Sequence, residues 1–228
     1  MDMQYRMFED AKSRFIDQIR NHVFITRCRE GKASLDELKS FVIQQSKYST
    51  HFTRYLCALM SNLPTNVEIL KLAENLFEEL GFDDSNGVPH HLIYKNMMEK
   101  LGISPQDEPT YPETENLIQK MLSACRHPNP AYGLGAICLG AEALVPSLYA
   151  DLISGFVACG IDRRDLEFFE IHVSCDDGHA ETIRDIMLEL GRKGGNSANI
   201  MIESGAVLVR ARLEFFSAIA ARAHTCVT

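Results

Sequence analysis

The chain has 228 residues, of which 46% are hydrophobic, and its formal net charge is −8 at pH 7. This length suits one helical domain over residues 1–228 with a sizeable core, and the negative charge argues against binding to nucleic acid, whose phosphates would be repelled. We expect no apolar run long enough to cross a membrane. The seven cysteines form no CxxC pair, which predicts reduced thiols in a cytoplasmic protein.

Helical periodicity dominates the chain, and no alternating strand pattern stands out. Two capping boxes, at Ser34 with Glu37 and at Thr65 with Glu68, predict helix starts, and Gly81 predicts a helix end. We therefore expect an all-α fold, one bundle of about seven or eight helices. In chain order, the predicted helices cover about 5–24, 35–61, 65–81, 90–101, 113–125, 131–159, 163–190 and 198–221.

The predicted central helix, 131–159, is expected to kink near Pro146. Glu142 is the only charged residue between Arg126 and Asp151, in an otherwise apolar run. A buried carboxylate needs a cation or a hydrogen-bond partner. We interpret Glu142 as a functional residue, with a structural ion pair as the alternative.

The segment after residue 171 carries three potential metal ligands, His172, Asp176 and His179. Their spacing of i, i+4 and i+7 places all three on one face of a helix. Such a face can also be solvated surface. The apolar residues Phe169 and Ile183 fall in or beside the same sector, which favours an inward face and therefore ligands.

Glu79 and His90 are ambiguous when each is taken alone. Glu79 belongs to a helix with other acidic residues, and His90 is followed directly by His91. Imidazole and carboxylate groups together suit metals that activate oxygen. Combined with Glu142 and the histidine-rich segment, they predict a two-metal centre inside a helical bundle.

The order of these residues resembles that of the haem-oxygenase-like di-metal oxidases. Within that superfamily the chain is similar to the group that holds the chlamydial death-domain-associating protein and its PqqC-like and TenA-like relatives. The resemblance extends from about residue 10 to 220. The family pattern is a Glu in an Asn-Leu-x-x-Glu segment, a His that opens the next helix, a Glu on a central helix, and His-x3-Asp-x2-His. Here it appears as Asn75-Leu-Phe-Glu-Glu79, His90, Glu142 and His172-x3-Asp176-x2-His179.

The resemblance implies a haem-oxygenase-like fold and two iron ions, as Fe/Fe or Fe/Mn, with O2 as co-substrate. It implies a di-iron oxidoreductase that oxidises a small, amino-acid-like substrate by N-oxygenation or C–C cleavage in natural-product biosynthesis, and a homodimer. His172, Asp176 and His179 would hold one metal, and Glu79, His90 and Glu142 would hold or bridge the other. All six are the expected catalytic residues.

Three other classes stay open. A non-enzymatic partner-binding protein and a cofactorless, PqqC-like oxidase can share this fold. A ferritin-like oxidase would normally show paired Glu-x-x-His motifs, which this chain lacks.

The substrate pocket is less clearly marked in the sequence. Arg210 or Arg212, on the last helix, could pair with a substrate carboxylate, although surface ion pairs are favoured for both. The candidates for the pocket wall are polar groups on otherwise apolar helices: Tyr48, His51, Tyr55 and Tyr149.

Overall fold

The computed structural model describes residues 3–82, 87–174, 178–192 and 194–223, and every regular element within these ranges is a helix. This confirms the predicted all-α class. The α-helices are α1 (Met3–Arg20), α2 (Val23–Arg29), α3 (Leu35–Ser49), α4 (Phe52–Met60), α5 (Asn66–Glu79), α6 (His90–Lys100), α7 (Pro112–Cys125), α8 (Ala131–Gly140), α9 (Val145–Ala158), α10 (Glu167–Ser174), α11 (Gly178–Arg192) and α12 (Ser197–Ala223). Two short 3-10 helices are η1 (Glu142–Leu144) and η2 (Arg163–Leu166).

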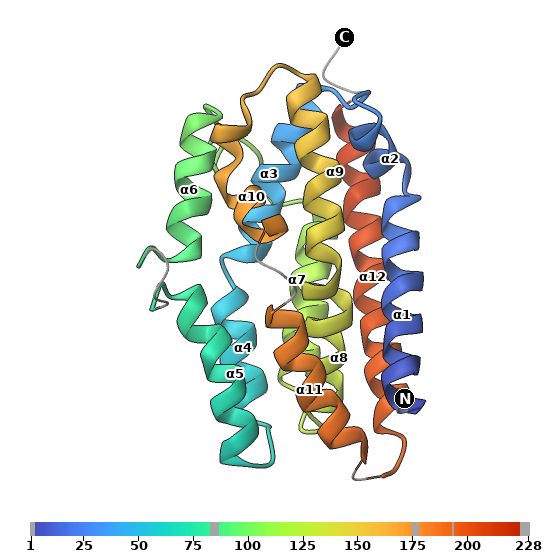
Figure 1. Ribbon diagram of the computed structural model, residues 1–228. Coiled ribbons are helices and arrows are strands. Elements are labelled where there is room, and N and C mark those ends of the chain that lie inside the picture. Colours follow the sequence, from blue (N-terminus) through green and yellow to red (C-terminus); the bar gives the residue numbers. More distant parts are fainter. Residues whose placement is uncertain (1–2, 83–86, 175–177, 193, 224–228) are drawn as a thin grey trace.

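Most of these helices are stacked end to end in columns. In Figure 1, α3 lies above α4, α6 above α5, α9 above α8, and α10 above α11. The breaks in these four columns lie near the middle of the molecule. Helix α12 runs unbroken along nearly the whole height, beside α1 (Figure 1). The bundle therefore has an upper and a lower half that share one continuous helix.

These breaks make the predicted number of seven or eight helices too low. The predicted helix over 131–159 is divided into α8, η1 and α9. Pro146 has no backbone N–H, and its ring collides with the carbonyl four residues earlier, at Glu142, in a regular α-helix. The regular helix therefore stops before Pro146. Ala141 lies outside the helical region, at φ −135° and ψ −79°, and a 3-10 turn follows over Glu142–Leu144. The predicted kink is thus a full break.

The predicted helix over 5–24 is also wrong at its end. Helix α1 stops at Arg20, and His22 is an extended residue that begins α2, a helix that the periodicity did not predict. The Nδ1 atom of His22 accepts a hydrogen bond from the backbone N–H of Phe24. Histidine is an uncommon N-cap, so its position gave no start signal.

A further break divides predicted helix 35–61. In the last turn of α3, the hydroxyls of Ser46 and Ser49 donate to carbonyls three residues earlier, which competes with regular helix hydrogen bonding. Local periodicity continues across this break and hides it. Predicted helix 163–190 is represented by η2, α10 and α11, and the link between α10 and α11, residues 175–177, lies outside the described residues.

Other predicted signals are confirmed. Ser34 caps α3 in a full capping box with Glu37, and the Thr65 hydroxyl accepts a hydrogen bond from the N–H of Glu68. Gly81 has φ +78°, the left-handed conformation expected after a helix end.

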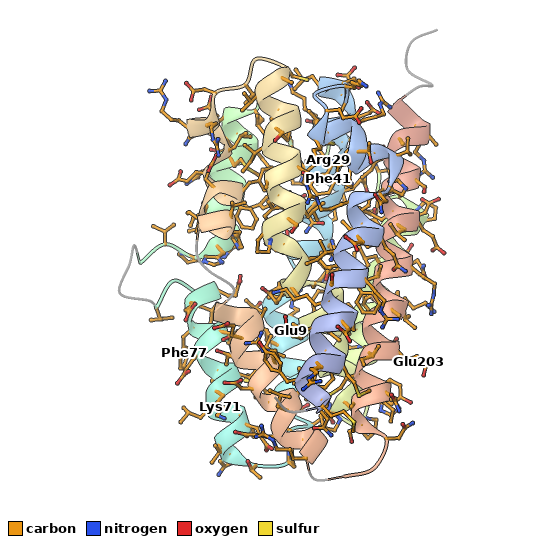
Figure 2. The ribbon with its side chains drawn as sticks, turned by 45° about the vertical axis from the view of Figure 1, so that its right-hand side comes forward. Glu9, Arg29, Phe41, Lys71, Phe77 and Glu203 are labelled. Carbon is orange, nitrogen blue, oxygen red and sulfur yellow. The ribbon has the colours of Figure 1, made fainter. Side chains whose placement is uncertain are left out.

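The core extends from α1 to α12. Phe41 is fully buried, and its ring lies 5.9–6.5 Å from those of Phe24, Phe169, Phe215 and Phe216, measured between ring centroids. Figure 2 shows Phe41 inside the bundle, whereas Phe77 lies on the outer side of α5 and is 51% exposed. Aromatic packing thus holds the upper half of the bundle together.

Helices α8 and α12 lie unusually close. A Cβ atom on Gly135 would lie 2.0 Å from the backbone oxygen of Met201, so no other residue fits at this position.

The expectation that no apolar run is long enough to cross a membrane is wrong. Among the described residues, the stretch Ala131–Ala158 is long and apolar enough to cross a membrane, although 72% of its apolar window is buried inside the bundle. Because α8 and α9 pack between other helices, their apolar surface is covered by the protein's own core.

Candidate metal centre and cavity

Glu79 and His90 meet where α5 ends and α6 begins. Glu79 is the last residue of α5 and His90 the first of α6, and the His90 Nδ1 atom lies 3.1 Å from Glu79 Oε1. Both side chains are largely buried, with 12% and 15% exposed.

Gly81 brings these two helix ends together. A Cβ atom on Gly81 would lie 2.6 Å from the backbone nitrogen of Pro89, so only glycine allows this approach. Pro89 is extended and precedes His90, which fixes the direction in which α6 leaves. The local sequence therefore determines how close Glu79 and His90 lie.

His172, on α10, is oriented by its own helix. Its Nδ1 atom lies 2.7 Å from the backbone oxygen of Phe168, one turn earlier. A carbonyl can only accept, so Nδ1 must carry the proton and donate it. In the neutral ring the lone pair then resides on Nε2, which is the arrangement that metal-binding histidines commonly use.

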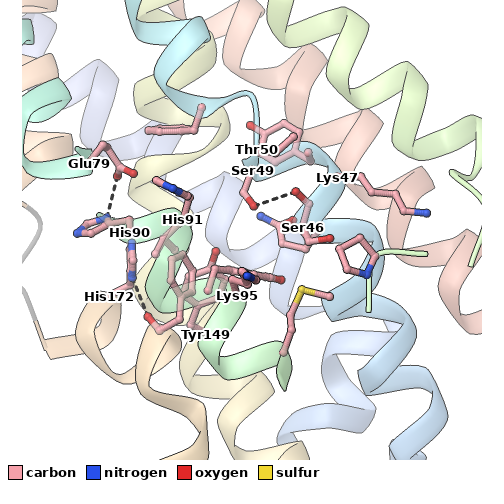
Figure 3. A pocket seen from close by; sticks show the side chains of 18 of the residues that line it. Ser46, Lys47, Ser49, Thr50, Glu79, His90, His91, Lys95, Tyr149 and His172 are labelled. Atoms are coloured by element: carbon pink, nitrogen blue, oxygen red, sulfur yellow. Dashed lines mark hydrogen bonds and ion pairs between the residues drawn. The ribbon is translucent and has the colours of Figure 1, made fainter. Parts of the chain in front are cut away.

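The structure brings three of the six predicted residues together. Ligand atoms of Glu79, His90 and His172 all lie within 4.8 Å of one another, and the two imidazole centroids are 4.9 Å apart. Figure 3 shows the three side chains grouped at one end of a cavity. Donor atoms that share one ion at about 2.1 Å lie roughly 3 to 4 Å apart, so small side-chain adjustments would close this group around a metal.

The donor set itself fits iron. Two imidazoles and one carboxylate form the ligand pattern of non-haem Fe(II) oxygenases. The three side chains are half-buried or more, and the proton on His172 Nδ1 is already placed away from the ligand atom. Glu79, His90 and His172 are therefore a candidate metal group with a suitable charge and tautomer.

The other three predicted residues are placed less completely. Glu142 opens η1, is half-buried and lines the same cavity, but it is not part of the group of three. Asp176 lies outside the described residues. His179 belongs to the first turn of α11, and its side chain is outside what the structure describes. The two-metal ligand set therefore stays a prediction.

The cavity has a volume of about 780 Å³ and reaches from the metal group to polar residues of α3 and the loop after α6. Aromatic rings form part of its wall. The Phe168 ring centroid lies 4.2 Å from that of His172 and 4.6 Å from that of Tyr94, and Tyr149 is 5.9 Å from His172. These rings keep one side of the histidines dry. The volume suits a small organic molecule.

Burial keeps the phenols of this wall protonated. Desolvation raises the pKa of Tyr48 to about 12, with the nearby Arg212 charge acting in the opposite direction. Burial likewise raises the pKa of Tyr149, and that of Tyr94 well above its usual value. At neutral pH these hydroxyls can therefore donate hydrogen bonds.

The predicted pocket wall was partly right. Tyr48 and Tyr149 line the cavity. Tyr55 and His51 are not among the lining residues; the Tyr55 hydroxyl donates to the backbone oxygen of Tyr48, and the ring of His51 lies beside that of Tyr55.

Arg212 was underestimated. It lines the cavity and is only 3% exposed, whereas Arg210 is exposed. The signal was available, because Leu208 and Phe215 stand four residues before and three residues after it, on one face of α12.

Comparison with known proteins assigns the family. The sequence model of a family described as iron-containing redox enzyme matches residues 39–208. The chain belongs to this family. All six predicted site residues of this iron-containing redox enzyme lie within the matched range, whereas Arg212 lies beyond it. A search of curated proteins gives no match.

Solved structures show the fold of this iron-containing redox enzyme. A domain with a haem-oxygenase-like fold from Shewanella denitrificans is 17% identical, with a TM-score of 0.78 over 98% of this chain and 94% of that one. A TenA homologue from Pseudomonas syringae pv. tomato is 14% identical, with a TM-score of 0.80 over 96% and 93%. A CADD-like protein of unknown function from Nostoc punctiforme is 16% identical, with a TM-score of 0.75 over 94% and 97%. The predicted haem-oxygenase-like fold is confirmed.

Proposed function

We propose that this iron-containing redox enzyme is a non-haem oxidase or oxygenase that uses O2 to oxidise a small, amino-acid-like molecule, by N-oxygenation or oxidative C–C cleavage. The observation that carries the proposal is the Glu79, His90 and His172 group at the end of a cavity that can hold such a molecule. Membership of an iron-containing redox family supports iron as the metal.

We further propose a dinuclear centre. Glu142 lines the same cavity as the group of three, and a second ion would be held by Glu142 together with Asp176 and His179. This division differs from the one that the family resemblance implied, because His172 is grouped here with Glu79 and His90 and not with Asp176 and His179. Three carboxylates would offset three of the four charges of two ferrous ions, which limits the uncompensated charge inside the bundle.

Iron bound at this group would supply one-electron redox chemistry and open coordination positions for O2 and substrate. The chain's own residues prepare the site. The Phe168 carbonyl holds the proton on His172 Nδ1, so the ring presents Nε2. Phe168 and Tyr149 shield the imidazoles from water on one side, and the protonated Tyr149 hydroxyl can donate to a bound molecule.

The test is an anaerobic Fe(II) titration with metal analysis after desalting, followed by O2 uptake. We expect about two irons per chain for the wild type. His172→Ala should retain about one iron or none and lose O2 uptake, and Glu142→Ala should retain about one, because one ligand of a first or second ion is removed.

His91→Ala is the matched control, since His91 neighbours His90 and lines the cavity but is exposed and outside the group of three. It should bind iron like the wild type. If the wild type and Glu142→Ala each bind one iron, the oxidase proposal stands and the proposal of a second metal is wrong. A wild type that binds no iron, with His172→Ala unchanged, would end the proposal.

A partner-binding protein is the second candidate. Val67, Leu70 and Phe77 are more than half exposed on α5, at spacings that share one side of a helix. Apolar side chains exposed in this way can contact another protein. This candidate takes over if the iron titration fails.

A further inference from the structure

Arg212 is a buried cation in the cavity wall. Its guanidinium Cζ lies 5.1 Å from the centroid of the Tyr48 ring, and only 3% of the residue is exposed. It makes no ion pair with a carboxylate of the described residues, and its Nε atom has no hydrogen-bond partner among them. Arginine cannot give up its charge in a protein, so this buried charge calls for an anion.

The Tyr48 hydroxyl adds a second donor beside it. This hydroxyl is buried, its oxygen faces the Arg212 guanidinium, and its proton has no acceptor among the described residues. Burial raises its pKa more than Arg212 lowers it, so the hydroxyl stays protonated. A planar guanidinium next to a phenol donor matches the geometry of a carboxylate, which accepts two or more hydrogen bonds.

The charge balance of the cavity leads to the same ligand. Without metal, the carboxylates of Glu79 and Glu142 line the cavity and offset part of the Arg212 charge. Part of the Arg212 charge is therefore uncompensated even without metal. If cations bind at Glu79, His90 and His172 and at Glu142, as the proposed function requires, both carboxylates are engaged and the whole Arg212 charge is left over. A ligand that carries its own negative group restores the balance.

The other residues of the cavity wall indicate what the remainder of the ligand is like. The lining also includes the apolar residues Phe52, Val145, Leu148 and Phe168, besides the charged residues Lys47, Lys95 and Glu99. The apolar part of the wall favours a ligand with a carbon chain or ring.

We propose that Arg212 and Tyr48 form the carboxylate site for an organic acid, so that the acid group is held by the protein and not by the metal. This inference rests on the proposed function only for the claim that the bound acid is then oxidised. Binding of the acid itself requires no metal. Arg212 is then the residue that selects acids over neutral molecules of the same shape.

The experiment uses metal-free, full-length protein and isothermal titration calorimetry. The probes are hexanoate, phenylacetate and N-acetylglycine, each compared with its neutral amide. We expect at least one acid to bind in the range up to about 10 mM and its amide to bind on the order of ten- to a hundredfold more weakly, as the loss of a charge-assisted hydrogen bond predicts.

Arg212→Gln should reduce the affinity for the acid by a similar factor, so that the acid and its amide bind with about the same affinity. Arg212→Lys should retain part of the preference, because it keeps the charge but loses the planar donor pair. Arg210→Gln, two residues earlier and exposed, is the matched control and should bind like the wild type.

A direct readout covers the case in which Arg212 variants fold poorly. In wild-type protein labelled with 15N at arginine Nε, one Nε–H resonance should shift when the preferred acid is added and remain in place with the amide. Equal binding of acids and amides, no acid binding up to about 10 mM, or a folded Arg212→Gln that keeps wild-type affinity would overturn the proposal.

The two proposals fail separately. If the protein prefers acids but binds no iron, the carboxylate-site proposal stands and the oxidase proposal is wrong. If it binds iron and takes up O2 but does not prefer acids, the oxidase proposal stands and the carboxylate-site proposal is wrong.

Discussion

His22 shows how much one side chain can determine. Its Nδ1 atom accepts the hydrogen bond that begins α2, so the neutral ring must carry its proton on Nε2, which lies 3.0 Å from the Ser217 hydroxyl oxygen. Its ring also packs against Phe216 of α12. A charged imidazole could not accept at Nδ1, and burial already lowers the pKa of His22.

We therefore predict a stability that depends on pH through His22. The folded pKa lies below the ordinary value of about 6.5, so the unfolded chain binds the proton more readily. Stability from this residue is complete above about pH 7 and falls as the pH drops through 6.5. His22→Asn keeps a good N-cap that does not titrate, and should lose less stability than the wild type between pH 7.5 and 5 in urea unfolding. Equal losses in both proteins would contradict this.

At the same scale, the sequence identified site residues unequally well. Glu142 stood out because it is a lone charge in an apolar run, and it does line the cavity. His172 stood out through its spacing. For Arg212, the spacing of Leu208 and Phe215 on α12 indicates an inward face, but the contact with Tyr48 comes from another helix and has no signal within α12.

At the scale of elements, helix ends position the metal group. Glu79 ends α5, His90 begins α6, Glu142 begins η1, and His172 lies in the last turn of α10. The capping boxes and glycine stops that mark some of these ends are local signals, so they were predictable. The break within predicted helix 35–61 was not, since the apolar periodicity continues across it. Within predicted helix 131–159, Pro146 indicates the position of the break but not that the kink becomes a full break.

Gly81 gives a prediction at this scale. Gly81→Ala combines an unfavourable positive φ with a collision at Pro89, so we expect a loss of roughly 2 to 4 kcal/mol and weaker Fe(II) binding as Glu79 and His90 separate. Gly102 also has a positive φ, +65°, but nothing lies within 4 Å of its Cβ position. Gly102→Ala should therefore cost only about 1 kcal/mol and leave iron binding unchanged. Thermal unfolding and iron analysis of both variants check the contrast, and equal effects would contradict it.

For the whole molecule, the metal group joins the two halves of the bundle. Glu79 belongs to the lower half, and His90 and His172 belong to the upper half (Figure 1). The fold class and family were predictable because many local signals agree. The number of helices was not, because it depends on how the halves meet.

A metal that binds only the folded chain must stabilise it. At a free Fe(II) concentration a hundred times the Kd, the gain is about 2.7 kcal/mol, which for a chain of this size raises Tm by roughly 5 to 10 °C. Anaerobic scanning calorimetry should show this rise in the wild type and His91→Ala, and a smaller rise or none in His172→Ala. An iron-loaded wild type with an unchanged Tm would contradict a site that exists only in the folded chain.

The broken columns have a consequence for hydration. Each helix end leaves up to about four backbone groups without an intrahelical partner, and several such ends meet around the cavity. We expect these groups, together with polar lining side chains such as Ser46, Ser49 and Gln106, to hold ordered water in a cavity whose remaining wall is aromatic and aliphatic. A ligand that enters must release that water and cover the apolar wall in its place. Calorimetry over a range of temperatures should then show a negative heat-capacity change on binding, larger for ligands with longer carbon chains.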